Sequence, residues 1–481
     1  DLHVVPTLAF EGFGLVVLEA AACGTPSLVT DAGGLPEAIR GAPMSRVVAA
    51  GDAAELAEAL ADYVSPPREE LRDWARASAW PIVAARHRRL YLDAGRPAAA
   101  RPLRVVVLDH VAQLSGGEIA LLRLLPHLKD VDVNVVLAED GPLVGRLHRE
   151  GISVQVLALG EATRALRKGA VGPRSIPPRA AWDFVVHLVR LTRLLRRQRP
   201  DVVHANSLKS GLYGGLAARA AGIPFVWHLH DRLDPDYLPP AATWLMRSAI
   251  SRLATKVMTN SACTASTLPA GTEATVVPSA LPQALPPAHR STDAERLVFG
   301  IVGRLTPWKG QHVFLEAFAR AFPDGEHNAV VIGAALFGED GYARDLQALA
   351  ARLGVADRVG FRGFREDIWA ELAAIDVLVH ASVTPEPFGQ VVQEGMAVGL
   401  PVIAADAGGP AEFVRHGVTG LLVGRDDPEA LAATMRLLAG DHELRRRLGT
   451  EARASCARFA PHLVAATVRA VYASAARREG G

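Results

Sequence analysis

The stretch Leu297-Val-Phe-Gly-Ile-Val-Gly-Arg-Leu-Thr-Pro-Trp-Lys-Gly310 holds the pattern that decides the fold. Six mainly apolar residues open it, as expected of a strand that a parallel sheet buries on both faces. Gly303, Arg304 and Lys309 follow that strand, and ligands bind at the carboxyl ends of strands in open α/β sheets. An Arg and a Lys placed there can clamp a diphosphate. The alternative is a basic surface loop, but the chain has only five lysines, which favours a functional role for this one.

Short apolar runs alternate with helical segments on both sides of this stretch, which is typical of parallel sheets covered by helices on both faces. One series of predicted strands precedes it, at residues 104–108, 133–137, 153–157, 201–204, 225–229 and 256–258. The second series is 297–302, 329–332, 359–361, 377–379, 401–404 and 420–423, after a proline-rich segment at 278–289. The sequence therefore predicts an α/β protein with two doubly wound domains facing a cleft, at 104–285 and 295–478.

An internal repeat precedes both domains. Glu11-Gly-Phe-Gly-Leu-Val-Val-Leu-Glu19 corresponds to Glu386-Pro-Phe-Gly-Gln-Val-Val-Gln-Glu394 at an offset of 386 − 11 = 375 residues. The same offset places Asp31-Ala-Gly-Gly34 on Asp406-Ala-Gly-Gly409. Residues 1–95 are thus predicted to be a partial copy of the back half of the later domain, joined to the rest by a linker at 96–103. A circular permutation is excluded because the later domain has its own back half, which leaves a truncated tandem protein or a fusion with a remnant.

Composition and charge exclude several classes of protein. The net charge of +1 gives no reason to expect nucleic-acid binding. The three cysteines lie far apart, so they form neither a disulfide framework nor a metal-ligand pattern, and they suit a reducing compartment. We found no membrane-spanning apolar run and no signal peptide, so a cytoplasmic protein is expected.

The carboxylates Glu386 and Glu394 flank a predicted helix start. A Pro-Phe-Gly loop follows Glu386, and residues 390–398 are predicted to be helical, with Glu394 about one turn inside. Free backbone N–H groups at such a start favour phosphate and sugar oxygens, and a carboxylate accepts hydrogen bonds from paired hydroxyls. The alternative is that Glu386 only complements the helix dipole and Glu394 lies on the surface.

Two further groups are candidates in the first domain. Gly116 and Gly117 follow its first strand and precede a helix predicted at 118–128; an ordinary turn is the alternative to a close backbone approach to a ligand. Among the histidines, only His230 stands at the carboxyl end of its strand. His204 and His228 are interpreted as structural, and no metal site is predicted.

Together these motifs resemble the retaining glycosyltransferases of family 4, whose GT-B fold has two Rossmann-like domains facing a cleft. The resemblance covers residues 101–481, and residues 1–95 would add a partial Rossmann-like half-domain. Its signatures are the Gly116-Gly117 loop, Asp201-Val-Val-His204-Ala-Asn-Ser, His230-Asp231, Gly303-Arg304 with Lys309-Gly310, and the pair Glu386 and Glu394. One departure is Ser279-Ala280, where the family often has Asn-Gly; it bears on the hinge and not on the donor site.

The resemblance implies a nucleotide-diphosphate sugar as donor and no cofactor or metal, because protein cations replace the metal. Arg304 and Lys309, in the loop of Gly303, would hold the diphosphate and stabilise the leaving group. Glu394 would bind the ribose hydroxyls. The loop containing Phe364 would face the base.

On the sugar side, the resemblance implies that Glu386 holds the donor sugar together with the backbone of Phe388, Gly389 and Gln390. His230 would contact the sugar from the opposite domain, and the Gly116-Gly117 loop would close on the phosphates. Departure of the leaving group is expected on the front side, without a carboxylate nucleophile. The acceptor would be a sugar, a lipid-linked molecule or a small molecule, in glycan, polysaccharide or glycolipid biosynthesis.

Three alternatives and one hypothesis complete the predictions. The chain could be another GT-B enzyme, such as a sugar-nucleotide epimerase or a glycoside phosphorylase, or a non-catalytic subunit that binds nucleotide sugars. Residues 185–197 form a basic amphipathic segment, which is either a sheet-covering helix or a peripheral contact with anionic lipid. Residues 1–95 have Glu11 and Glu19 but no Gly-Arg and Lys-Gly segment, so we expect them to be catalytically silent.

Overall fold

The computed structural model describes residues 1–64, 68–76, 78–84, 87–88, 101–160, 177–235, 237–288, 296–335 and 339–477. It divides into two compact units, Asp1–Ala100 and Arg101–Gly481. Most of the predicted linker at 96–103 lies outside the described residues. No helix among the described residues has the length and apolarity that crossing a membrane requires.

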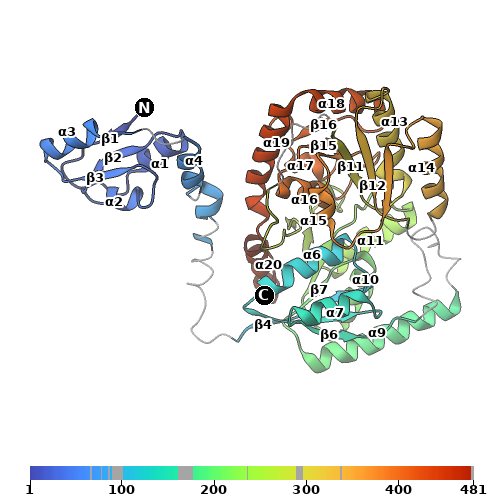
Figure 1. The fold of residues 1–481 in the computed structure, drawn as a ribbon. Helices are drawn as coiled ribbons and strands as arrows, with labels where there is room; N and C mark the ends of the chain where they lie inside the picture. Colours follow the sequence, from blue (N-terminus) through green and yellow to red (C-terminus); the bar gives the residue numbers. More distant parts are fainter. Residues whose placement is uncertain are drawn as a thin grey trace. The chain divides into compact units, whose positions relative to one another are not determined.

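The first lobe of the larger unit is built on a seven-stranded parallel sheet with strand order β10-β9-β8-β7-β4-β5-β6. Figure 1 labels β4, β6 and β7 of this lobe among its helices. Its strands are β4 (Leu103–Asp109), β5 (Val131–Leu137), β6 (Ser153–Val156), β7 (Val202–Ala205), β8 (Phe225–Leu229), β9 (Lys256–Thr259) and β10 (Ala274–Val276). The helices between them are α6 (Gly116–Leu124), η1 (Leu125–His127), α7 (Pro142–Arg149), α9 (Pro178–Gln198), α10 (Leu208–Ala221), α11 (Pro240–Leu253) and α12 (Ala262–Ala265). Helix α6 begins at Gly116, two residues before the predicted start, because Ser115 already occupies the extended N-cap conformation.

The second lobe is built on a six-stranded parallel sheet with strand order β13-β12-β11-β14-β15-β16. Its strands are β11 (Val298–Val302), β12 (Asn328–Ile332), β13 (Val359–Gly363), β14 (Val377–His380), β15 (Val402–Ala405) and β16 (Leu421–Val423). Its helices are η2 (Pro307–Lys309), α13 (Gln311–Ala321), α14 (Asp340–Arg352), α15 (Ile368–Ala373), α16 (Gln390–Val398), α17 (Pro410–Phe413), α18 (Pro428–Gly440), α19 (His442–Ser455), η3 (Cys456–Phe459) and α20 (Pro461–Ala476). The two parallel sheets confirm the predicted doubly wound α/β fold.

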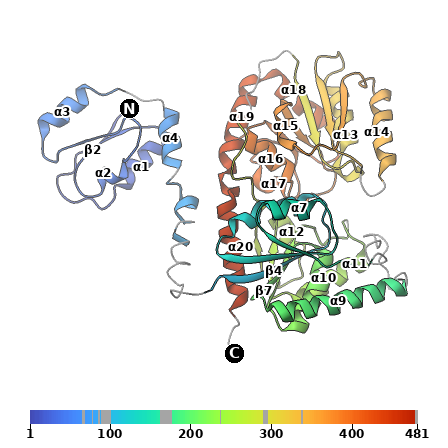
Figure 2. The same ribbon diagram turned by 60° about the horizontal axis from the view of Figure 1, so that its bottom comes forward.

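Apolar side chains on both faces of each sheet form the cores. In the second lobe one cluster includes Phe299, Phe314 and Phe318, and a cluster on the other face includes Met396 and Phe413. Helix α20 follows the second lobe in sequence, yet its Val464, Val468 and Tyr472 belong to the core cluster of the first lobe (Figure 2). The last helix therefore ties the two lobes together by hydrophobic burial.

The smaller unit contains a three-stranded parallel sheet, order β1-β2-β3, which confirms the predicted partial half-domain. Its strands are β1 (His3–Val5), β2 (Ser27–Thr30) and β3 (Arg46–Val48). Its helices are α1 (Leu15–Ala22), α2 (Leu35–Ala38), α3 (Ala53–Ala61) and α4 (Arg68–Arg76). Asp52 caps α3 by accepting hydrogen bonds from the backbone N–H groups of Ala54 and Glu55.

Candidate functional site

Lys309 and Glu386 meet beside the carboxyl ends of β11 and β14. Lys309 Nζ lies 2.6 Å from Glu386 Oε1, and their side chains are 15% and 12% exposed. The lysine comes from η2, and the glutamate comes from the loop that leads into α16. The ion pair thus brings together the first two sequence motifs at the sheet edge where ligands bind in this class of fold.

Gly310 explains how the lysine loop reaches this position. Its φ of 72° lies in the left-handed region, and a Cβ there would stand 1.9 Å from the carbonyl oxygen of Ala381. Only glycine allows this approach of two backbones without displacement. The close approach holds Lys309 against the end of β14, where its ammonium also lies 4.6 Å from the centre of the Trp308 ring.

Three hydrogen-bonding side chains fix the carboxylate of Glu386. Besides Lys309, His380 Nε2 lies 2.7 Å from Oε2, and Ser382 Oγ donates to Oε2 at 3.1 Å. Burial raises the pKa of Glu386, but the Lys309 charge and the hydrogen bonds from His380 and Lys309 outweigh it and hold that pKa well below its usual range. Glu386 is therefore an ionised acceptor at neutral pH. Sequence reasoning missed His380 and Ser382, although both lie within six residues of Glu386.

Glu394 faces the first lobe and not solvent, which disfavours the surface alternative. Arg123 Nη2 on α6 lies 2.6 Å from Glu394 Oε1, and their side chains are 12% and 5% exposed. Gln390 bridges the same lobes, since its amide donates to the Gly116 carbonyl and accepts from Arg123 Nη1, each at 3.0 Å. Arg123 was not predicted, because nothing in the sequence links it to a carboxylate 271 residues later.

Arg304 takes a different partner from Lys309. Its Nε lies 3.6 Å from Glu339 Oε2, and the side chain is 34% exposed. Glu339 also accepts a hydrogen bond from Thr306 Oγ1 at 2.6 Å. The two basic residues of the predicted clamp therefore start from separate ion pairs, and their joint action on a diphosphate stays a prediction.

His230 lies directly after β8 and contacts Asn206, which follows β7. Its Nε2 is 3.0 Å from Asn206 Oδ1. Burial lowers the pKa of His230, and the charges of Asp109 and Asp231 oppose this only in part. The imidazole is thus neutral at neutral pH. A Cβ on Gly117 would lie 3.7 Å from the His230 ring, which brings the glycine loop and the histidine together.

The remaining predicted donor-site residues differ in whether the side chain or only the backbone is accessible to a ligand. The Phe388 side chain is 6% exposed in an aromatic cluster with Phe413 and Phe459, so only its backbone remains to meet a ligand. Gly389, with a φ of 85°, is the N-cap of α16. Phe364 follows β13 and is 65% exposed. Gly303, with a φ of 150°, lies against the Lys309 side chain.

The other two histidines belong to the core, as predicted. His204 Nδ1 lies 2.7 Å from the Tyr472 hydroxyl, and burial lowers the pKa of His204 to about 3. The His228 ring lies 4.2 Å from that of His230 and 5.5 Å from that of His204. Burial, followed by the charges of His230 and His204, lowers the pKa of His228 well below its usual value.

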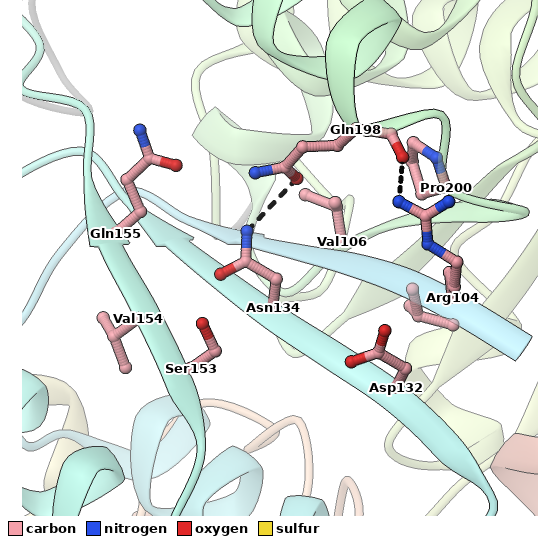
Figure 3. Close-up of a pocket in the computed structure, with 10 residues that line it drawn as sticks. Arg104, Val106, Asp132, Asn134, Ser153, Val154, Gln155, Gln198 and Pro200 are labelled. Atoms are coloured by element: carbon pink, nitrogen blue, oxygen red, sulfur yellow. Dashed lines mark hydrogen bonds between the residues drawn. The ribbon is translucent and has the colours of Figure 1, made fainter. Parts of the chain in front are cut away.

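The first lobe also has an open polar hollow of about 430 Å³, far from these residues in the fold. Figure 3 shows Asp132, Asn134 and Ser153 lining it, near the amino ends of β5 and β6. Asn134 Nδ2 donates to Gln198 Oε1 at 3.2 Å across it. Since ligands of doubly wound sheets bind at the opposite, carboxyl ends, the hollow is not part of the candidate site.

Three family models match successive parts of the chain. "Glycosyl transferases group 1" matches residues 287–455, and "Glycosyltransferase Family 4" matches residues 143–281. A second model with the description "Glycosyl transferases group 1" matches residues 1–65. The last match coincides with the three-stranded sheet of the smaller unit.

The alignments with two relatives and one solved structure span most of the length of each of those proteins. D-inositol 3-phosphate glycosyltransferase of Streptomyces scabiei is 33% identical over 57% of this chain and 68% of the relative. GDP-mannose-dependent alpha-mannosyltransferase of Mycobacterium tuberculosis is 30% identical over 66% of this chain and 82% of the relative. The structure of Anabaena Alr3699/HepE with UDP-glucose matches with a TM-score of 0.67 and 28% identity, covering 77% of this chain and all, 100%, of that one.

Proposed function

This chain belongs to the group 1, family 4 glycosyltransferases, which use nucleotide-sugar donors, and on that premise we propose that it transfers the sugar to a hydroxyl acceptor with retention. The observation that supports this most is the buried Lys309–Glu386 ion pair at the carboxyl ends of the second-lobe strands. Glu394, on the helix that follows Glu386, pairs with Arg123 of the first lobe. We place the reaction in glycan, polysaccharide or glycolipid biosynthesis.

Lys309 and Arg304 are proposed to bind the donor diphosphate. As the bond from the sugar to the phosphate breaks, negative charge accumulates on the leaving phosphate oxygen, and preorganised cations stabilise it. Lys309 is held for this role on three sides, by Glu386, the Trp308 ring and the Gly303 loop. Arg304 would turn from Glu339 toward the second phosphate, at the cost of a partly exposed ion pair worth about 0–1 kcal/mol.

Glu386 and Glu394 are proposed to accept hydrogen bonds from the sugar hydroxyls and the ribose hydroxyls, respectively. Backbone N–H groups of Phe388, Gly389 and Gln390 at the start of α16 would contact the sugar and the phosphates. The glycine loop of Gly116 and Gly117 would approach the phosphates from the first lobe, and the exposed Phe364 would face the base.

Retention is proposed to proceed on one face of the sugar. The carboxylate of Glu386 is held by Lys309, His380 and Ser382, which weakens it as a nucleophile. The acceptor oxygen would bond to the sugar carbon as the phosphate oxygen leaves, and that oxygen would take the acceptor's proton. Since the leaving phosphate takes up the acceptor's proton, the reaction needs no further acid or base from the protein.

A thermal-shift and calorimetric screen tests the donor site. UDP and UDP-glucose come first, because Alr3699/HepE was solved with UDP-glucose at 28% identity, and GDP-mannose comes second, because the mycobacterial relative is named for it. Wild-type protein should bind one nucleoside diphosphate, and Lys309→Ala should abolish the shift. Lys256→Ala, a change of an exposed lysine at the start of β9, is the matched control. Release of free nucleoside diphosphate on adding acceptor separates an enzyme from a subunit that only binds.

For the acceptor, the surface of α9 supports a lipid-linked molecule. Trp182, Val185, Val186 and Val189 lie on one face of this helix and are 69%, 48%, 36% and 42% exposed. The exposed Arg193, Arg196 and Arg197 continue the same face, which suits an anionic lipid surface. Co-sedimentation with anionic vesicles at low salt should fall when Trp182 and Val185 become alanine, but not with Trp244→Ala, a change of a 70% exposed tryptophan on α11. Absence of wild-type binding would exclude the membrane contact.

A further inference from the structure

Three polar residues at the ends of neighbouring strands form a row in the first lobe. Asp109 ends β4, Asn206 follows β7, and His230 follows β8, and these strands are adjacent in the order β8-β7-β4. Asp109 is 0% exposed and Asn206 is 2% exposed. The row therefore leads from a buried carboxylate to the histidine of the candidate site.

The hydrogen-bonding partners of Asn206 permit one orientation of its amide. Asn206 Nδ2 lies 2.7 Å from Asp109 Oδ2 and 3.3 Å from the carbonyl oxygen of Gly117. A carboxylate and a carbonyl only accept hydrogen bonds, so the amide nitrogen must face them. The amide oxygen then faces His230.

Asp109 is ionised and so enforces that orientation. Burial raises its pKa, but hydrogen bonds from His110 and Asn206 and the charge of His110 outweigh this and lower it. Glu118 on α6 is mostly protonated at neutral pH, because burial and then the charge of Asp109 raise the pKa of Glu118 to about 8.

This orientation also determines which nitrogen of His230 carries the proton. Asn206 Oδ1 only accepts, so the His230 Nε2 that lies 3.0 Å away must be the donor. The neutral imidazole has a single N–H, which leaves its acceptor lone pair on Nδ1.

We propose that Asn206, oriented by Asp109, is a positioning residue that locks His230 in the Nε2–H tautomer, so that Nδ1 accepts a hydrogen bond from a hydroxyl of the donor sugar. This rests on the proposed function, in which His230 contacts that sugar. A neutral acceptor also places no like charge beside the sugar carbon, which gains positive charge as its bond to phosphate breaks. By the same amide Asn206 ties the Gly117 loop to His230.

Selective ¹⁵N labelling of histidine in the full chain tests the tautomer. The His230 signals, identified by their loss in His230→Gln, should report a proton on Nε2 in wild-type protein. In Asn206→Ala they should shift toward a mixture of the two tautomers. Unchanged His230 signals in Asn206→Ala would overturn the proposal.

Enzyme kinetics test whether the tautomer of His230 affects catalysis. Asn206→Ala should lower kcat for transfer about tenfold or more, the loss of about 1.4 kcal/mol of transition-state stabilisation. The affinity for UDP, which lacks the sugar, should stay within about twofold, and Asn134→Ala on β5 is the matched control. The pH profile of kcat should also change in Asn206→Ala, because the hydrogen bond from His230 to Asn206 is lost while the charges of Asp109 and Asp231 still act on the pKa of His230. The neighbouring His228 and His204 rings also stay in place. A kcat equal to that of wild-type protein would overturn the proposal.

Asp109→Asn gives an independent variant of equal size should Asn206→Ala fail to fold. An amide at position 109 can donate as well as accept, so the variant removes the shorter of the two hydrogen bonds that orient the Asn206 amide and leaves only the one to Gly117 at 3.3 Å. A shift of His230 toward a tautomer mixture and a loss of kcat are therefore expected. Failure of wild-type protein to bind any nucleoside diphosphate would instead contradict the proposed function and leave the tautomer measurement intact.

Discussion

The three-stranded sheet near the N-terminus and the back half of the six-stranded sheet share a backbone design but differ in what surrounds it. The pairing His3↔Ser27 corresponds to Leu378↔Val402, since 378 − 3 = 375 and 402 − 27 = 375. Leu28↔Arg46 corresponds to Ile403↔Leu421 in the same way. Register is thus identical in the two copies, although in the described part of the smaller unit the sheet has three strands and no counterparts of β11, β12 and β13.

The loop that presents the first carboxylate is also the same in both copies. Gly33 and Gly408 have φ values of 61° and 69°, and a Cβ on them would lie 2.2 and 2.3 Å from the carbonyl oxygens of Glu11 and Glu386. The following glycine donates its N–H to that same oxygen at 2.8 Å in each copy. The repeated Asp-Ala-Gly-Gly motif is therefore a local device for packing two loops together.

The side chains differ because the lysine loop and a facing lobe surround the site in the larger unit, whereas the described residues of the smaller unit form a single three-stranded sheet with its helices. Glu394 is 4% exposed, whereas Glu19 lies exposed in the smaller unit. Phe388 is 6% exposed and Phe13 is 47% exposed, and at the repeat offset of 375 an alanine, Ala38, stands where Phe413 packs against Phe388. The smaller unit therefore repeats the backbone of the candidate site but not the surroundings of its side chains.

Matched phenylalanine changes should show the largest difference in stability. Phe388→Ala removes a buried ring and should lower the free energy of unfolding by about 3–5 kcal/mol. Phe13→Ala removes a half-exposed ring and should cost about 0.5 kcal/mol. Hydrogen exchange on peptides from each unit measures both, and equal losses would contradict the packing difference.

Substitutions in the two copies should differ in their effect on turnover. Lys309→Ala removes the cation beside the leaving phosphate and should lower turnover about 10²–10³-fold, or about 2.7–4 kcal/mol. Glu11→Gln, in the copy that lacks this lysine, should leave turnover unchanged. The measurement is nucleoside diphosphate release in the presence of acceptor, and full activity of Lys309→Ala would exclude the clamp.

The second carboxylates should differ in nucleotide affinity. Glu394→Gln removes a charged acceptor for the ribose hydroxyls, which is worth about 1.5–3 kcal/mol, or a roughly ten- to hundredfold weaker Kd. Glu19→Gln should have no effect, because Glu19 is exposed and no facing lobe belongs to its unit. Calorimetry with UDP compares them, and equal affinities for wild-type protein and Glu394→Gln would mean that ribose binds elsewhere.

Removal of the smaller unit should have the smallest effect. A chain that begins at Arg101 retains both lobes and should keep its turnover within about twofold, as expected of an independent compact unit. A large loss of turnover with an unchanged melting temperature would contradict the hypothesis that residues 1–95 are catalytically silent.

Much of the fold could be predicted because it depends on local patterns. Apolar runs at 225–229 and 298–302 mark strands, and the Pro-Phe-Gly before Gln390 marks the start of α16, which spans the predicted 390–398. The candidate site was predicted less completely. His380 stood in no motif, and Asn206 stood in the 201–207 motif without a role of its own, so only their partners in the structure give them roles.

The sequence by itself determined the strands, the parallel α/β character of the sheets, the repeat and the glycines that let loops meet, because these show as local patterns in the chain. Only the tertiary structure decided that Arg123 meets Glu394, that Asp109 and Asn206 set the proton of His230, and that α20 returns to the first lobe. Such contacts join residues up to hundreds of positions apart, and the physical reason is that burial makes each charge or amide depend on the partner that the fold provides.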